Sequence, residues 1–167
     1  MALAIDADVA LFRALGLAAR QLNAAIEQRL QAAANISLPE FEILEALRHA
    51  EHHKLRSGEL GEMLAWEKSR TSHQVARMQR RALVDRATCS DDLRGTWVSL
   101  TDAGLAAVTT AAAAYHAAIE THVSGVVGTG DADAVARLAV QICRRVAPEA
   151  CEGEVADLER RLGLIAR

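Results

Sequence analysis

The chain has 167 residues, of which 51% are hydrophobic and only 3% aromatic, and its formal net charge is -3. This length accommodates one domain with an ordinary core, and the alanine-rich, aromatic-poor composition favours packed helices over a β-sandwich. No segment has the roughly 18 uninterrupted apolar residues of a membrane span, and the acidic Asp6 and Asp8 oppose a signal peptide, so we expect a cytoplasmic protein with no membrane partner.

The first part of the chain predicts two helices. From about residue 9 to residue 34 apolar residues recur at helical spacing, which indicates a long amphipathic helix. Ser37 then provides a cap, Pro39 a first-turn proline and Glu40 an early acid before FEILEALRHA, so a second helix is expected there. The polar segment EHHKLRS is expected to be a linker.

The next elements predict a helix-turn-helix. Ser57 is placed to cap a short helix through GELGEMLA, and the basic segment WEKSRTSHQVARMQRR follows at residues 66–81. Val75 and Met78 in this segment and Ala82 directly after it share one stripe, which we expect to be buried. The rest of the helix surface is then left to Arg70, His73, Gln74, Arg77 and Arg81. Two helices this close in sequence require a tight turn between them.

A β-hairpin and further long helices are expected to follow. LVDRATC and TWVSL have strand character and flank the turn SDDLRG, which makes a wing behind the helix-turn-helix. Thr101 is placed to cap a long alanine-rich helix, and Asp131 opens another in which Cys143 is expected to pack. We therefore predict a mainly α fold in one domain, 1–167, with a winged helix-turn-helix lobe at 38–100 and a tail at 150–167. The helices at 1–36 and 101–149 have more apolar surface than such a lobe covers, so they are expected to dimerise.

Several segments resemble the MarR family of bacterial winged-helix transcriptional regulators. They are LPEFEILEALRHA, SGELGEMLA, EKSRTSHQVARMQRRALVDR and DDLRGTWVSLTDAG, in this order between long terminal helices. Two positions depart from the family pattern, because Ala82 stands where glycine is usual and Leu93 where the first wing arginine is usual. The resemblance implies a ligand-responsive repressor that binds a pseudo-palindromic operator as a homodimer, with a small-molecule effector bound between the dimer helices and the lobe.

Charge is distributed unevenly along the chain. From Lys68 to Arg94 seven basic and three acidic residues give a local net charge of +4, which leaves -7 for the rest of the chain. One basic face on an acidic body suits a polyphosphate partner, here double-stranded DNA. The residues assigned to DNA are Ser69, Arg70, Ser72, His73, Gln74, Arg77, Arg80 and Arg94. Of these, His73, Gln74 and Arg77 are expected to read bases, Ser69, Arg70 and Arg80 to hold phosphate, and Arg94 to enter the minor groove.

Other functions have weaker support in the sequence. His49, His52 and His53 have the i, i+3, i+4 spacing of metal ligands on a helix, but neighbouring positive charge and the lack of a nearby cysteine oppose a site. We therefore assign no metal and no cofactor, and keep a metal-responsive regulator as an alternative. A second alternative is a protein-interaction module that has the winged-helix shape and does not bind DNA.

Catalysis and thiol chemistry are not expected. No Ser-His-Asp spacing, glycine-rich phosphate loop or HExxH motif is present, so we expect no enzyme. The odd number of cysteines without CxxC spacing predicts neither disulfides nor a zinc knuckle, although Cys89 near the wing is a candidate reactive thiol. Phe41 and Trp66 are candidate wall residues of an effector pocket.

Overall fold

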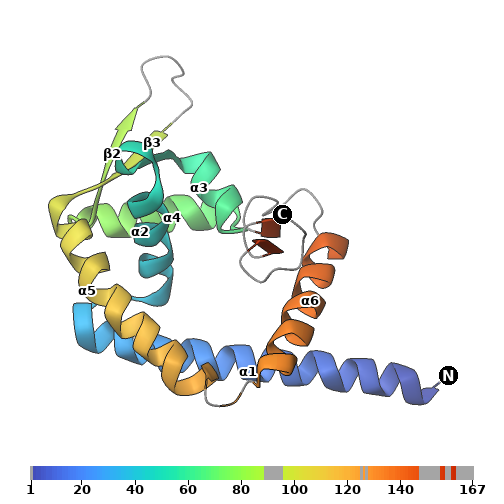
Figure 1. Ribbon diagram of the computed structural model, residues 1–167. Helices are drawn as coiled ribbons and strands as arrows, with labels where there is room; N and C mark the ends of the chain where they lie inside the picture. Colours follow the sequence, from blue (N-terminus) through green and yellow to red (C-terminus); the bar gives the residue numbers. More distant parts are fainter. Residues whose placement is uncertain are drawn as a thin grey trace.

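The computed structural model describes residues 2–88, 96–124, 126, 128–146, 155–156 and 159–160. The elements in chain order are α1 (Ala2–Ala34), α2 (Leu38–His49), the 3-10 turn η1 (Glu51–His53), β1 (Lys54–Arg56), α3 (Ser57–Met63), α4 (Lys68–Arg80), β2 (Val84–Thr88), β3 (Thr96–Leu100), α5 (Asp102–Ile119), the π-helical turn η2 (Glu120–Ser124) and α6 (Thr129–Val146) (Figure 1). The predicted fold class, mainly α with a small antiparallel sheet, is confirmed.

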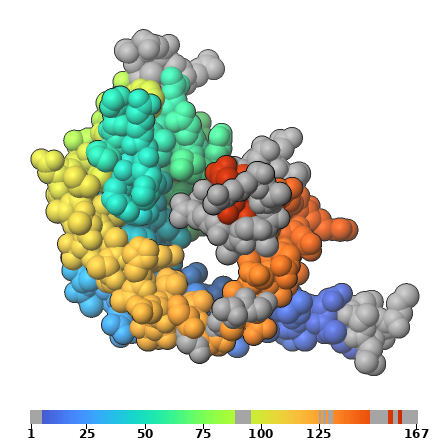
Figure 2. Space-filling view, viewed as in Figure 1, coloured from blue at the N-terminus to red at the C-terminus, as the bar shows by residue number. Residues whose placement is uncertain are grey.

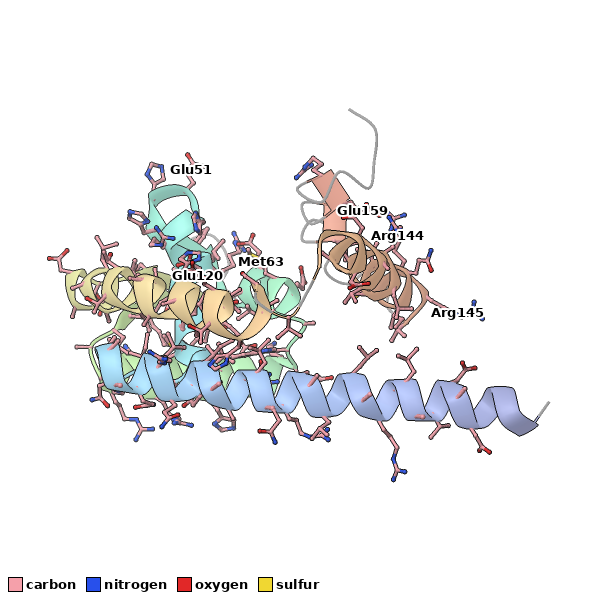
Figure 3. All side chains as sticks on the ribbon, turned by 60° about the horizontal axis from the view of Figure 1, so that its bottom comes forward. Glu51, Met63, Glu120, Arg144, Arg145 and Glu159 are labelled. Atoms are coloured by element: carbon pink, nitrogen blue, oxygen red, sulfur yellow. The ribbon has the colours of Figure 1, made fainter. Side chains whose placement is uncertain are left out.

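The core lies where the C-terminal half of α1 meets α2, α5 and the lobe above them (Figure 1). Its fully buried aliphatic side chains include Leu30, Ile43, Leu44, Leu47, Leu60, Val98 and Val108. The N-terminal half of α1 extends beyond this core, and Figure 3 shows its side chains standing clear of the lobe and of α5. Only the second half of the apolar stripe predicted for this helix is therefore buried within one chain.

The start of α2 forms as the sequence predicted. The Ser37 hydroxyl accepts a hydrogen bond from the Glu40 amide at 3.3 Å, and the Ser37 amide donates to the Glu40 carboxylate at 2.8 Å. This reciprocal pair is a capping box, and Pro39 occupies the first turn, where its missing N–H costs nothing. Local sequence is sufficient to place this helix terminus.

The sheet has one more strand than the sequence predicted. Residues 54–56, expected to be part of a linker, form β1 and pair antiparallel with β3, with Leu55 opposite Val98, so that the strand order is β1-β3-β2. A strand of three residues is too short to show alternation, and only its pairing with β3 defines it. The predicted cap of α3 is also wrong, because Arg56 is the N-cap residue and its amide donates to the Glu59 carboxylate at 2.9 Å.

Thr101 joins the wing to α5, as predicted. Its hydroxyl accepts from the Gly104 amide at 3.0 Å and contacts the Leu83 carbonyl oxygen at 3.0 Å. A Cβ at Gly104 would lie 2.0 Å from the same Leu83 oxygen, so only glycine permits this close approach of α5 to the start of β2. This geometry accounts physically for the Thr-x-x-Gly spacing in the sequence.

The helix α6 lies to one side of the lobe (Figure 2), and few of its described residues lie near α1. Of the tail, residues 155–156 and 159–160 are described and helical, and the buried Glu159 accepts a hydrogen bond from Arg144 at 2.7 Å (Figure 3). Cys143, expected to pack, is exposed. Among the described residues, no helix has the length and apolar character to cross a membrane.

Candidate nucleic-acid interface

The α3–α4 pair forms the predicted helix-turn-helix with a tight turn. The Trp66 amide donates to the Gly61 carbonyl at 2.8 Å, and Ala65 between the helices has a φ of 51°. A Cβ at Gly61 would lie 3.1 Å from the Thr71 hydroxyl oxygen, so the absence of a side chain lets α3 and α4 approach closely. The turn therefore holds α4 in a defined orientation against α3.

The buried stripe of α4 begins earlier in the helix than predicted. Val75 and Met78 are buried as expected, but their partners on the stripe are Thr71 and Gln74, and Ala82 is exposed. The helix ends at Arg80, so Ala82 cannot continue the stripe, and the i, i+3, i+4, i+7 pattern runs from Thr71 to Met78 instead. The expectation that Gln74 faces outward is wrong, because it is 9% exposed and its Nε2 has no hydrogen-bond partner in the described structure.

The opposite face of α4 is polar and open. The residues assigned to DNA that lie exposed there are Ser69, Arg70, His73, Arg77 and Arg80, with Ser72 partly exposed beside them. The Arg70 guanidinium lies 4.0 Å from the Trp66 ring centroid, a cation–π contact that orients the arginine at the start of the helix. Arg94 lies outside the described residues, as does Cys89. The structure thus brings six of the eight assigned residues together on one helix face.

The end of α4 is closed by backbone hydrogen bonds around Ala82. The Ala82 amide donates to the Gln79 carbonyl at 2.9 Å, and the Leu83 amide donates to the Met78 carbonyl at 3.0 Å. These two bonds define a Schellman motif, and Ala82 adopts the left-handed conformation that the motif requires, with a φ of 55°. The helix therefore ends as it would with glycine, although alanine pays a conformational cost there.

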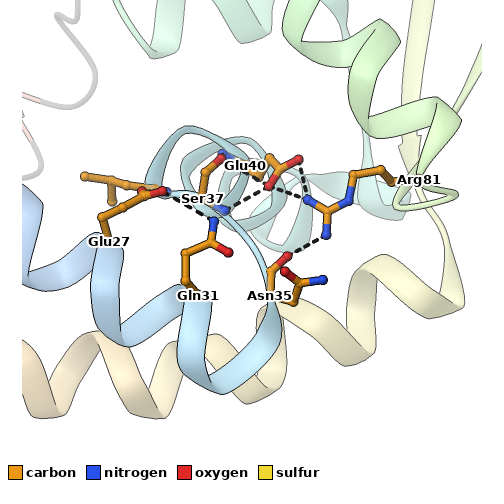
Figure 4. A network of polar contacts seen from close by, with 7 residues as sticks. Glu27, Gln31, Asn35, Ser37, Glu40 and Arg81 are labelled. Carbon is orange, nitrogen blue, oxygen red and sulfur yellow. Dashed lines mark hydrogen bonds and ion pairs between the residues drawn. The ribbon is translucent and has the colours of Figure 1, made fainter.

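Arg81 lies in the basic segment but is held by an ion pair. Its Nη1 donates to the two carboxylate oxygens of Glu40 at 2.8 and 2.7 Å, and its Nη2 donates to the Asn35 carbonyl oxygen (Figure 4). Glu27 accepts a hydrogen bond from the Leu38 amide in the same network. Arg81 was expected on the open surface. Its side chain is 38% exposed, but Nη1 and Nη2 already donate to Glu40 and Asn35.

The wing sheet carries basic residues that the sequence analysis did not assign. The Lys54 ammonium lies 4.4 Å and the Arg56 guanidinium 5.2 Å from the Trp97 ring centroid, on the face of the sheet opposite to the buried Val98. The segment KLR was visible in the sequence. It was not recognised because the pairing of β1 with β3, which brings it to Trp97, is a tertiary contact.

The three histidines do not form a metal site. The helix α2 ends at His49, and His52 and His53 have φ values of 55° and 54°, so the three side chains no longer share a helical face. His49 instead lies 3.0 Å from a carboxylate oxygen of Glu45. In the described ranges no group of three or more His, Cys, Asp or Glu side chains is arranged to hold a metal ion.

The two candidate effector-wall residues lie at different helix junctions. Phe41 is buried between α2 and α5, where its ring stacks on Tyr115 with a centroid distance of 4.8 Å. Burial raises the pKa of Tyr115, and the nearby Glu42 and Glu45 raise it further, so its hydroxyl is held in the neutral form. Trp66 lies in the α3–α4 turn against Arg70. Of the two, Phe41 has an aromatic neighbour that could extend a flat apolar wall.

The arrangement of α2, α3, α4 and the three strands defines the chain as a winged helix-turn-helix protein. A sequence model described as "MarR family" matches residues 34–95, which contain the helix-turn-helix and the first wing strand. The segment 34–95 therefore matches the MarR family, and the resemblance seen in the sequence is confirmed.

Solved structures extend the likeness to the terminal helices. AbsC, a MarR family transcriptional regulator from Streptomyces coelicolor, is 26% identical with a TM-score of 0.79 over 86% of this chain and 97% of its own. Sco3205, a MarR family regulator from the same organism solved in complex with DNA, is 24% identical with a TM-score of 0.79 over 83% and 87%. An organohalide sensing regulator in the 2,4-dichlorophenol bound form is 14% identical with a TM-score of 0.77 over 84% and 82%. No curated protein matches the chain significantly.

Proposed function

We propose that this chain is a sequence-specific DNA-binding repressor that acts as a homodimer on a pseudo-palindromic operator and is released by a small-molecule effector. The observation that carries the proposal is the exposed polar face of α4, which gathers arginine, histidine and serine side chains on a helix of a winged helix-turn-helix lobe. The rest of the chain has a net negative charge, so this basic face is a favourable place for a negatively charged ligand. The DNA complex of the similar Sco3205 supports this use of the fold.

The roles of the individual residues follow from their exposure and chemistry. Arg77 and His73, exposed one turn apart, are assigned to base edges, because arginine pairs with guanine in two hydrogen bonds. Ser69, Arg70 and Arg80 are assigned to phosphates. Ser72 and Arg94 keep the DNA contacts assigned from the sequence, with Arg94 in the minor groove. Gln74 is withdrawn as a base-reading residue because its amide is buried.

The apolar side chains on the outer helices support a homodimer. On α1 the exposed set is Val9, Leu11, Phe12, Leu15 and Leu17, and on α6 it is Val135, Ile142 and Val146. Burying such a side chain from full exposure contributes about 1.5–3 kcal/mol. Most of these side chains are about half exposed, so each contributes a fraction of this when a second copy covers it. A two-fold dimer would present two α4 helices to half-sites about one DNA turn apart.

An effector is supported by the similar organohalide sensing regulator, which was solved with 2,4-dichlorophenol. In this chain the Phe41–Tyr115 stack lies between α2, which belongs to the lobe, and α5, which belongs to the proposed dimer body. A ligand bound at such a junction shifts the population toward one lobe orientation if it binds that orientation more tightly. The orientation it favours would place the α4 helices at a spacing that does not match the operator.

The proposal is tested by a gel shift with DNA from around the chain's own gene, across a salt series. A protein that makes six to ten phosphate contacts loses about 10³- to 10⁵-fold in affinity between 50 and 200 mM salt, and footprinting should show a protected palindrome. Absence of binding at low salt would contradict the proposal and favour the protein-interaction module. Sedimentation of wild type and Phe12→Glu tests the dimer, because a charge at this exposed apolar position should weaken self-association.

A further inference from the structure

One arginine of the basic segment is turned away from the open face of α4. The Arg81 side chain is 38% exposed, but its partner Glu40 is 3% exposed, and the two form a forked ion pair at 2.7 Å. A buried carboxylate requires a partner, because an unpaired charge in this position is strongly unfavourable. The protein therefore holds Arg81 at Glu40, and this arginine is not available to phosphate as its neighbour Arg80 is.

The guanidinium of Arg81 connects the ends of three helices. Asn35, whose carbonyl accepts from Nη2, follows the last residue of α1 and has a φ of 52°. Glu40 lies in the first turn of α2, where its carboxylate also accepts from the Ser37 amide at 2.8 Å. Arg81 is itself the C-cap residue of α4. Figure 4 shows the three contacts converging on one side chain.

The connection links two helices, α4 and α1, whose main packing partners differ apart from α2, which contacts both. The helix α4 packs mainly on α3, β2 and α2, whereas α1 packs mainly on α5 and α2. A polar contact joins the end of α4 directly to the end of α1, from Arg81 to the Asn35 carbonyl oxygen. Movement of α4 relative to α1 would pull this guanidinium from one of its two acceptors.

We propose that Arg81 is a positioning residue that fixes the orientation of α4 relative to α1, and that it thereby sets the half-site spacing that the dimer accepts. The inference rests on the proposed function, in which α1 belongs to the dimer body and α4 reads DNA. Arg81 acts through this geometry and touches no DNA. The planar fork of arginine is required, because one ammonium group cannot satisfy the Glu40 carboxylate and the Asn35 carbonyl with the same fixed geometry.

The first test compares spacing preference. Affinities are measured for the operator and for versions with one base pair added or removed between the half-sites, with wild type, Arg81→Gln, Arg81→Lys and the matched control Arg80→Gln. Arg81→Gln and Arg81→Lys should reduce the preference for the native spacing by about tenfold, within the range known for residues that alter coupling without contacting a ligand. For these two variants, the slope of log affinity against log salt concentration should equal the wild-type slope. Arg80→Gln should lower the slope by about one and keep the spacing preference.

The inference is overturned if Arg81→Gln lowers the salt slope as Arg80→Gln does and leaves the spacing preference intact, because Arg81 is then a phosphate contact. It is also overturned if Arg81→Gln changes neither quantity. If Arg81→Gln folds poorly because Glu40 is left unpaired, the double variant Glu40→Gln/Arg81→Gln removes both charges, and glutamine retains the acceptor of the capping box. This variant should show the same loss of spacing preference.

The second test needs no DNA. Spin labels at the exposed positions Gln28 on α1 and Gln79 on α4 report the distance between the helices, in a chain whose cysteines are replaced by serine and which is diluted with unlabelled protein. The distance distribution should be broader in Arg81→Gln than in wild type, and unchanged in Arg80→Gln. Equal widths in wild type and Arg81→Gln overturn the inference. If wild type binds no DNA, the proposed function fails, and the label distances still decide whether Arg81 orients α4.

Discussion

Replacing Ala82 with glycine should stabilise the protein. Ala82 follows α4 in the left-handed conformation, with a φ of 55°, and its side chain is exposed, so the substitution removes no buried contact. The two hydrogen bonds of the Schellman motif are made by backbone groups and are retained by glycine. The substitution therefore changes only the backbone strain of the folded state and the conformational entropy of the unfolded state.

The magnitude follows from two opposing effects. A non-glycine residue in the left-handed region costs about 1–2 kcal/mol, and glycine loses about 0.4–1 kcal/mol through the greater freedom of the unfolded chain. Taking the middle of each range, the difference is a gain of about 0.8 kcal/mol in the free energy of unfolding for Ala82→Gly. For a chain of this size the melting temperature should rise by about 1–4 °C.

The assay is thermal and urea unfolding at one fixed protein concentration, because dimerisation makes the apparent stability depend on concentration. Ala76→Gly is the matched control, since Ala76 lies within α4, where glycine costs about 0.8–1 kcal/mol relative to alanine. The two substitutions should change stability in opposite directions. If both destabilise the protein by similar amounts, the left-handed conformation does not control the cost at position 82 and the reasoning is refuted.

Three further predictions concern the reading helix, the turn before it and the acid stability. Arg77→Ala should cost about 1–3 kcal/mol of DNA binding and relax the preference for one base position; an equal loss on every sequence in a gel shift would make it a phosphate contact instead. Gly61→Ala should destabilise the fold by about 1–3 kcal/mol because the added Cβ would lie 3.1 Å from the Thr71 hydroxyl, and unchanged urea unfolding would contradict this. Burial raises the pKa of Glu45, but hydrogen bonding to Arg48 and a neighbouring histidine outweighs it and holds the pKa below the ordinary 4.5. A lowered carboxyl pKa stabilises the fold above 4.5 and this contribution is lost as the pH falls through the folded pKa, so Glu45→Gln should flatten the acid limb of a stability profile, and an unchanged limb would count against it.

The proposed reading surface depends on how α4 is held as much as on what it exposes. Buried Thr71, Val75 and Met78 hold the helix from behind, and Trp66 orients Arg70 at its start. Arg81 closes its far end against Glu40. Rigid support of this kind reduces the entropy that a side chain loses on meeting a base or phosphate, which favours specific binding.

The sequence by itself determined the features whose signals are local. Ser37, Pro39 and Glu40 define the start of α2 because a capping box is completed within three residues. The helix-turn-helix and the strands on either side of residues 89–95 follow from the change of apolar period, which needs no knowledge of distant contacts. The family resemblance rests on the same local patterns, and the match over residues 34–95 confirms it.

Tertiary structure alone decided three features of the candidate site. The strand β1 forms because β3 supplies its hydrogen-bond partners. Its three residues are too few to show an apolar–polar alternation in the sequence. Gln74 is buried because the face of α4 that packs into the lobe is wide enough to include it beside Thr71, Val75 and Met78. Arg81 is a structural residue because Glu40, distant in the sequence, lies beside it in the fold. Side-chain identity shows what a residue can bind, but its neighbours in space determine whether it is free to do so.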